Sequence, residues 1–146
     1  MPASLRLGEK RILAAVRCTE RGEFTESRHW IDTYFSEDDG LTWTNVGRPV
    51  PASGMGGNPP TLTRLEDGRI ILIYGYRAEP FGIRAKISED GGGSWGEDIV
   101  LRDDGGNQDL GYPRTVLRAD GSLVTAYYYN DTAEGDRYIS ATIWKP

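Results

Sequence analysis

The octet SEDDGLTW (residues 36–43) recurs fifty-two residues later as SEDGGGSW (residues 88–95). The two copies share Ser, Asp, Gly and Trp at equivalent places, which are Ser36, Asp38, Gly40 and Trp43 in the first copy and Ser88, Asp90, Gly92 and Trp95 in the second. Self-similarity at a fixed period indicates a repeat architecture in which each copy is one supersecondary unit. The octets therefore predict a chain built from similar units of about fifty residues.

A second pair of segments repeats in phase with the octets. TLTRLEDGRIILIYGY contains Asp67 and Gly68, and TVLRADGSLVTAYYY contains Asp120 and Gly121, fifty-three residues further on. Each segment has a β-rich run, an acidic-Gly turn and a second β-rich run, which is typical of a hairpin. The stretch LRLGEKRILAAVR near the N-terminus is a third copy.

The repeats divide the chain into units of roughly 1–52, 53–105 and 106–146. In the middle unit we expect strands near 60–65, 69–76, 83–88 and 97–102, with the octet as the turn between the last two. The third unit ends in RYISATIWKP, without an octet or a fourth strand. No segment has a convincing helical period.

Four-stranded antiparallel units of this length are the blades of a β-propeller. We therefore predict an all-β propeller fragment of about three blades of four-stranded antiparallel sheets, the last ending after its third strand. In such a fold the octets lie on one face, and the loops between second and third strands open on the opposite face with the loops between units. Asp38 and Asp90 are then expected to bond turn amides, while Trp43 and Trp95 fill a sheet layer.

The octets match the Asp box, S-x-D-x-G-x-[ST]-W, of the bacterial neuraminidase repeat. The chain thus resembles the C-terminal half of a six-bladed propeller of the sialidase (neuraminidase) family. This resemblance implies a glycoside hydrolase of exo-α-sialidase type, which acts on terminal sialic acid or a related 2-keto sugar acid. Two alternatives stay open: a small independent sheet protein, and a non-catalytic propeller that binds glycans or proteins.

The resemblance also implies site residues. Tyr112 takes the place of the nucleophile, eight residues before a hairpin turn, although Pro113 stands where the family usually has a small hydroxyl residue. Arg17 and Arg77 take two places of the three-arginine clamp for the substrate carboxylate, a role that suits planar guanidinium groups. The activating Glu falls on Met1, and the third Arg and the acid Asp belong to earlier blades. We therefore expect a fragment that is inactive alone and that associates through exposed blade edges.

Four further residues are candidates for substrate contact: Arg84, Asp109, Arg114 and Asn58. Four of the candidate site residues also have a structural interpretation. A rim position explains Tyr112, a strand-end position explains Arg17, turn capping explains Asp109, and an inter-blade ion pair explains Arg114.

Composition excludes several classes of function. The net charge is −5 and the basic residues are scattered, which argues against nucleic acid as a partner. No apolar run is long enough to cross a membrane. Cys18 is the single cysteine, and His29 has no partner at metal-ligand spacing, so we expect neither a disulfide nor a metal or other cofactor. The cellular compartment stays open.

Overall fold

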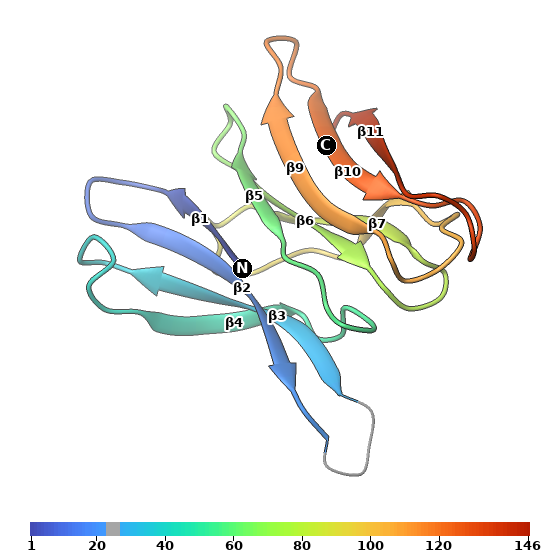
Figure 1. Cartoon of the computed structure of the whole chain (residues 1–146). Helices are drawn as coiled ribbons and strands as arrows, with labels where there is room; N and C mark the ends of the chain where they lie inside the picture. The colour runs from blue at the N-terminus through green and yellow to red at the C-terminus, as the bar shows by residue number, and fades with distance from the viewer. Residues whose placement is uncertain (23–26) are drawn as a thin grey trace.

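The computed structural model describes residues 1–22 and 27–146, and these residues form strands, turns and loops without a helix. Within this described part of the chain, eleven strands make three antiparallel sheets in chain order (Figure 1). Sheet 1 contains β1 (Pro2–Arg6), β2 (Ile12–Glu20), β3 (Arg28–Ser36) and β4 (Thr44–Val50); sheet 2 contains β5 (Thr61–Arg64), β6 (Ile70–Tyr76), β7 (Gly82–Ser88) and β8 (Ile99–Arg102); sheet 3 contains β9 (Gly111–Leu117), β10 (Leu123–Tyr129) and β11 (Tyr138–Trp144).

This architecture confirms the prediction of an all-β chain of propeller blades. The four strands expected in the middle unit agree with β5 to β8 within two residues at each end. Sheet 3 has three strands in the order β11, β10 and β9. Among the described residues, β11 pairs with β10 and is an edge strand.

The hairpin turns owe their shape to short-range hydrogen bonds. Asp67 accepts a hydrogen bond from the backbone N–H of Arg69 at 3.0 Å, and Asp120 accepts one from the N–H of Ser122 at the same distance. The residue after each Asp is a glycine with positive φ, a conformation that costs glycine little. Local sequence therefore fixes the register of β5 with β6 and of β9 with β10.

The sheets stand side by side, and their first strands lie next to one another: β1 contacts β5, and β5 contacts β9 (Figure 1). Apolar side chains fill both spaces between the sheets. Leu13 and Phe35 of sheet 1 pack on Ile70 of sheet 2, while Ile71 and Ile73, on the other face of sheet 2, pack against sheet 3. Strand β6 therefore contributes alternate residues to two different cores.

The three consecutive tyrosines of β10 follow the same alternation. Tyr127 and Tyr129 are buried in the core between sheets 2 and 3, while Tyr128 points to the other face of sheet 3.

Within residues 1–22 and 27–146, no helix is long and apolar enough to span a membrane.

Candidate functional site

The two octets form nearly identical turns. In each, the Ser hydroxyl donates to the Asp carboxylate at 2.8 Å. The same hydroxyl accepts the backbone N–H of the conserved glycine, Gly40 or Gly92, at 2.7 Å. The same carboxylate accepts both the N–H and the hydroxyl of the residue before Trp, which is Thr42 or Ser94. These bonds lower the pKa of Asp38 to about 2, and the hydrogen bond from the Thr42 hydroxyl is the largest cause. The pKa of Asp90 is also lowered, chiefly by the hydrogen bond from the Ser94 hydroxyl. Both carboxylates are fully engaged in holding a turn.

The octet tryptophans differ. Trp95 is partly buried against residues of both sheet 1 and sheet 2, including Leu13 and Phe35. Trp43 is 43% exposed, and its indole N–H donates to the carbonyl of Gly40 within its own turn. The expectation that both tryptophans fill a sheet layer is therefore wrong for Trp43, because no sheet of the described residues covers that side of sheet 1.

The opposite ends of the sheets carry loops that are tied together by backbone hydrogen bonds. The loop after β4 passes close to β3, where the N–H of Ser53 donates to the carbonyl of His29 at 2.9 Å. The same loop pairs with the loop after β6, since Arg77 donates to Ser53 at 2.9 Å and accepts from Met55 at 3.0 Å. We call this loop-bearing side, with residues 51–60, 77–81 and 103–112, the rim.

Tyr112 lies at the rim in a strained conformation. Its φ is +52°, a left-handed value that is uncommon for a bulky residue, and the preceding Gly111 also has positive φ. The side chain is 39% exposed. Backbone strain of this kind costs on the order of 1–3 kcal/mol and is concentrated at functional sites, so Tyr112 marks the rim as a candidate site.

Asn58 holds Tyr112 in this conformation. Its side-chain oxygen accepts the N–H of Tyr112 at 3.0 Å and that of Gly75 at 3.2 Å, and its amide group donates to the carbonyl of Leu110 at 3.1 Å. Asn58 is fully buried. The sequence-based expectation that Asn58 contacts a sugar is therefore wrong, because all of its bonds go to backbone groups beneath the rim.

Arg77 lies beside Tyr112, with its guanidinium carbon 5.8 Å from the centre of the phenol ring. Its Nε donates to the carbonyl of Leu110 at 3.0 Å, and its Nη2 donates to the hydroxyl of Tyr128 at 2.7 Å. These two contacts orient the guanidinium and leave the Nη1 donors for a ligand.

Tyr128 connects Arg77 to Asp109. Its hydroxyl donates to the Asp109 carboxylate at 2.8 Å, and Asp109 also accepts from Arg137 at 2.8 Å. Burial and then the bond to Asp109 raise the pKa of Tyr128 to about 12, while the bond from Tyr128 is the largest cause lowering the pKa of Asp109. Tyr128 is therefore a neutral donor at ordinary pH. Tyr128 is not among the candidates named from the sequence, although strand alternation puts it on the opposite sheet face from Tyr127 and Tyr129.

Arg17 approaches the rim from β2. The turn at Gly56 and Gly57 lies between the two arginines: a Cβ on Gly57 would sit 3.0 Å from Arg17 Cδ, and one on Gly56 would sit 3.5 Å from Arg77 Nη1. Burial lowers the pKa of the neighbouring His29, and the charges of both arginines lower it further. Among residues 1–22 and 27–146, no carboxylate forms a salt bridge with either arginine. Arg17 and Arg77 thus lie close together without a direct ion pair, although the rim itself also holds the carboxylates of Glu79 and Asp109.

Other predicted residues are not brought to this cluster. Arg84 pairs with Asp98 at 3.2 Å and covers the ring of Tyr76, so its guanidinium lies between sheets 1 and 2. Arg114 is exposed on the face of sheet 3 that points away from sheet 2, which we call the far face of sheet 3, and it donates to the carbonyl of Pro113. Asp109 is at the rim, but it bonds Tyr128 and not Tyr112.

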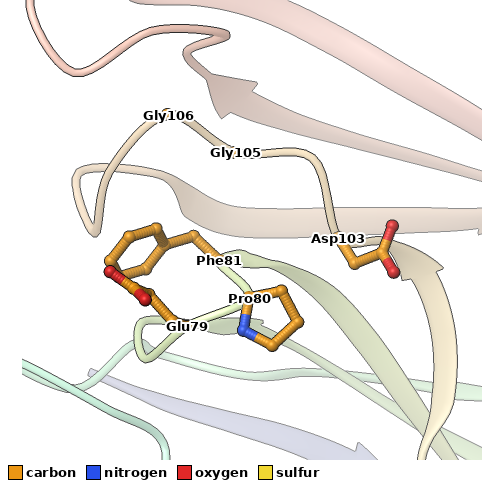
Figure 2. Close-up of a pocket in the computed structure, with 6 residues that line it drawn as sticks. All are labelled: Glu79, Pro80, Phe81, Asp103, Gly105 and Gly106. Atoms are coloured by element: carbon orange, nitrogen blue, oxygen red, sulfur yellow. The ribbon is translucent and has the colours of Figure 1, made fainter.

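Two hollows open near the rim. A cleft of about 690 Å³ is lined by Arg77 together with His29, Met55 and Phe81. A second hollow of about 510 Å³ lies between the loop after β6 and the loop after β8, with Glu79 and Phe81 on one side and Gly105 and Gly106 opposite (Figure 2). Its charged lining is the carboxylates of Glu79 and Asp103, which disfavour an anionic ligand. The part of the chain that the structure describes has no cluster of three His, Cys, Asp or Glu side chains suited to a metal ion.

These features define an all-β protein of propeller blades with a strained rim that brings two arginines close together. No protein-family profile matches the chain, and no curated protein matches it. Solved structures do resemble it in fold. An α-L-arabinanase from Penicillium chrysogenum, complexed with arabinobiose, is 18% identical with a TM-score of 0.70, over 97% of this chain and 44% of the arabinanase.

Two further structures are similar. The GH93 α-L-arabinofuranosidase of Fusarium graminearum, also complexed with arabinobiose, is 19% identical with a TM-score of 0.66, over 99% of this chain and 46% of that enzyme. A PL25 ulvan lyase bound to -[GlcA(1-4)Rha3S]- is 14% identical with a TM-score of 0.64, over 88% of this chain and 31% of the lyase. The chain spans less than half the length of each of the three. At these identities the likeness supports the propeller fold, and none of the three is a sialidase.

Proposed function

We propose that the rim binds an acidic sugar, with Arg17 and Arg77 facing its carboxylate and Tyr112 facing its anomeric carbon. The observation that carries this proposal is the left-handed Tyr112, held by a buried Asn58 beside Arg77. Planar guanidinium groups match the geometry of a carboxylate, and neither arginine has a carboxylate partner among the residues described. The proposed ligand supplies a carboxylate partner for both arginines.

The propeller-fold neighbours add support of a general kind. Two are named as enzymes of arabinose-containing glycans, and the third is a polysaccharide lyase bound to a glucuronate-containing glycan. We infer from them that this chain belongs to a carbohydrate-active protein. The acidic character of the substrate rests on the two arginines.

The reaction we propose for the whole protein is hydrolysis of exo-α-sialidase type, on sialic acid or a related 2-keto sugar acid. The substrate carboxylate sits on the anomeric carbon, so a neutral tyrosine approaches that carbon with less repulsion than a carboxylate would. As the Tyr112 oxygen bonds the anomeric carbon, its hydroxyl proton passes to the activating Glu, the glycosidic C–O bond breaks and the leaving oxygen takes a proton from the acid Asp. Water then displaces the tyrosine, giving one proton to the Asp, while the Glu returns its proton to the Tyr112 oxygen. The resemblance assigns the activating Glu to the position of Met1 and the proton-donating Asp to no residue of this chain. We therefore expect the 146-residue chain to bind without turnover.

One observation favours a second function, glycan binding without catalysis. Across residues 1–22 and 27–146, the Tyr112 hydroxyl has no hydrogen bond to a basic group, whereas an activated nucleophile needs one. A binding rim requires only Arg17, Arg77 and the exposed phenol ring.

The test is binding of N-acetylneuraminic acid to the 146-residue chain, measured by saturation-transfer NMR, with its methyl ester as the uncharged control. We expect the acid to bind at least about tenfold more tightly than the ester, because charge-assisted hydrogen bonds are lost in the ester. Arg17→Met should remove that preference, while Arg118→Met, an exposed arginine outside the rim, should retain it. Equal binding of acid and ester would overturn the proposal. In the same samples, release of 4-methylumbelliferone from its sialoside would separate an enzyme from a binding protein.

A further inference from the structure

The chain builds the same kind of joint between sheets twice. Each joint uses a pair of cross-strand neighbours on one sheet, Leu13 with Phe35 in sheet 1 and Ile71 with Ile87 in sheet 2. The next sheet presents the first residue of its second strand to this pair. Ile70 of β6 packs in this way on sheet 1, and Leu123 of β10 packs on sheet 2.

The second octet completes the first joint. Trp95 packs in the cluster that contains Leu13 and Phe35. Gly92 lies so close to this pair that an added Cβ would meet Leu13 Cδ2 at 2.7 Å and Phe35 Cζ at 3.4 Å. One sheet thus supplies an apolar pair, and the next supplies a strand-start residue and an octet.

The far face of sheet 3 repeats the apolar pair. Val124 and Ile143 are cross-strand neighbours, as Ile71 and Ile87 are in sheet 2, and Val116 pairs with Val124 on the other side. Ile143 and Val116 are each 62% exposed, and Ile139 on the same face is 79% exposed. An exposed run of large apolar side chains on one sheet face indicates an interaction surface.

The far face of sheet 1 repeats the complementary half. Ile12 begins β2 as Ile70 begins β6, and Trp43 holds the octet position of Trp95. A Cβ on Gly40 would meet only Trp43 and Ile12 of its own sheet, at 3.8 and 3.9 Å. Sheet 1 therefore carries a strand-start residue and an octet that lack an apolar pair within the described residues.

We propose that the far face of sheet 3 binds the far face of sheet 1 of a second copy of this chain. The joint would seat Trp43 and Ile12 of one copy against Val124 and Ile143 of the other, as Trp95 and Ile70 seat against Leu13 and Phe35. A second copy is the occupant because one chain carries both complementary halves of a joint that it already makes internally. The contact is heterologous, since two different faces meet. Each copy carries a net charge of −5, so added salt should strengthen the association.

The test is the mass of the 146-residue chain in solution, measured by light scattering after size exclusion over a range of concentrations. We expect a concentration-dependent shift from 16.2 kDa to at least twice that mass. Ile143→Glu should weaken the association at least about tenfold, because the joint would bury a charge against apolar side chains. Val100→Glu is the matched control, since Val100 is 52% exposed on β8, outside both far faces.

Mixing experiments test which faces meet. Trp43→Glu and Ile143→Glu each leave one far face intact, so neither variant should associate alone, yet an equimolar mixture should form a dimer through the intact pair of faces. Circular dichroism of each variant checks its fold, and if Trp43→Glu does not fold, the comparison of Ile143→Glu with Val100→Glu still decides. A 16.2 kDa monomer at every concentration would overturn the proposal and assign these faces to another polypeptide. So would association that Ile143→Glu and Val100→Glu affect equally.

Discussion

In both octets an Asp carboxylate bonds the same two groups of the residue before Trp, yet the tryptophans that follow have different surroundings. Trp95 is partly buried between sheets 1 and 2, and 43% of the surface of Trp43 is exposed. Eight residues are therefore enough to specify the turn, because its bonds are local. They do not specify the packing of the indole, which depends on the sheet next to it. The comparison separates what an octet does within its own sheet from what it does between sheets.

Removing the two indoles should give the largest difference. We expect Trp95→Ala to lower the free energy of unfolding by about 2–4 kcal/mol, because it empties a space between two sheets. Trp43→Ala should cost under about 1 kcal/mol, because its indole contacts little beyond its own turn. Urea unfolding at the lowest practical protein concentration measures both values. Equal losses would show that burial between sheets is not what distinguishes the octets.

Adding a methyl group to each turn should give a smaller difference. Gly92→Ala and Gly40→Ala impose the same left-handed strain, since φ is +101° and +93°. Only at Gly92 does the new methyl group meet Leu13 of the neighbouring sheet, at 2.7 Å, whereas at Gly40 its nearest neighbours are Trp43 and Ile12, at the ordinary contact distances of 3.8 and 3.9 Å. We expect Gly92→Ala to be the more destabilising by about 1 kcal/mol. Thermal unfolding of the two variants side by side provides the measurement, and a larger loss in Gly40→Ala would contradict the expectation.

The carboxylates should give the smallest difference between the octets, because their bonds are the same. The pKa of Asp38 is lowered from 3.8 to about 2, and that of Asp90 is also lowered. Their contribution to stability is therefore complete above about pH 4 and is lost as the pH falls through the lowered values. Asp38→Asn and Asp90→Asn should each lower the urea midpoint at pH 6 and approach the wild type near pH 2. A gap between variant and wild type that stays constant over this range would refute the local hydrogen-bond account.

The strands and turns could be predicted from sequence because their causes are short-range. Acidic-Gly hairpins and alternating β-rich runs placed β5 to β8 within two residues. The rim was harder to predict. Asn58 appeared to be an accessible loop amide, yet it is buried because Gly75 of sheet 2 and Leu110, just before β9, close over it. Nothing in a single sequence indicates a contact that joins residues fifty-two positions apart.

The same limit applies to Tyr112 and Tyr128. The spacing to Asp120 pointed to Tyr112, but its positive φ follows from the bond to Asn58, which the sequence does not reveal. Tyr128 lies in a run of three tyrosines, and nothing in that run singles it out. Its bonds to Arg77 and Asp109 depend on how the loop after β8 folds back over sheet 3.

The bonds of Asn58 also have a mechanical consequence. One side chain fastens the end of β6 to the start of β9, so sheets 2 and 3 cannot hinge apart at the rim unless Asn58 releases at least one of its three partners. The phenol ring of Tyr112 is exposed, but its backbone N–H donates to the buried side-chain oxygen of Asn58. This amide proton should therefore exchange with deuterium slowly. The rate of that exchange reports how often the two sheets open at the rim.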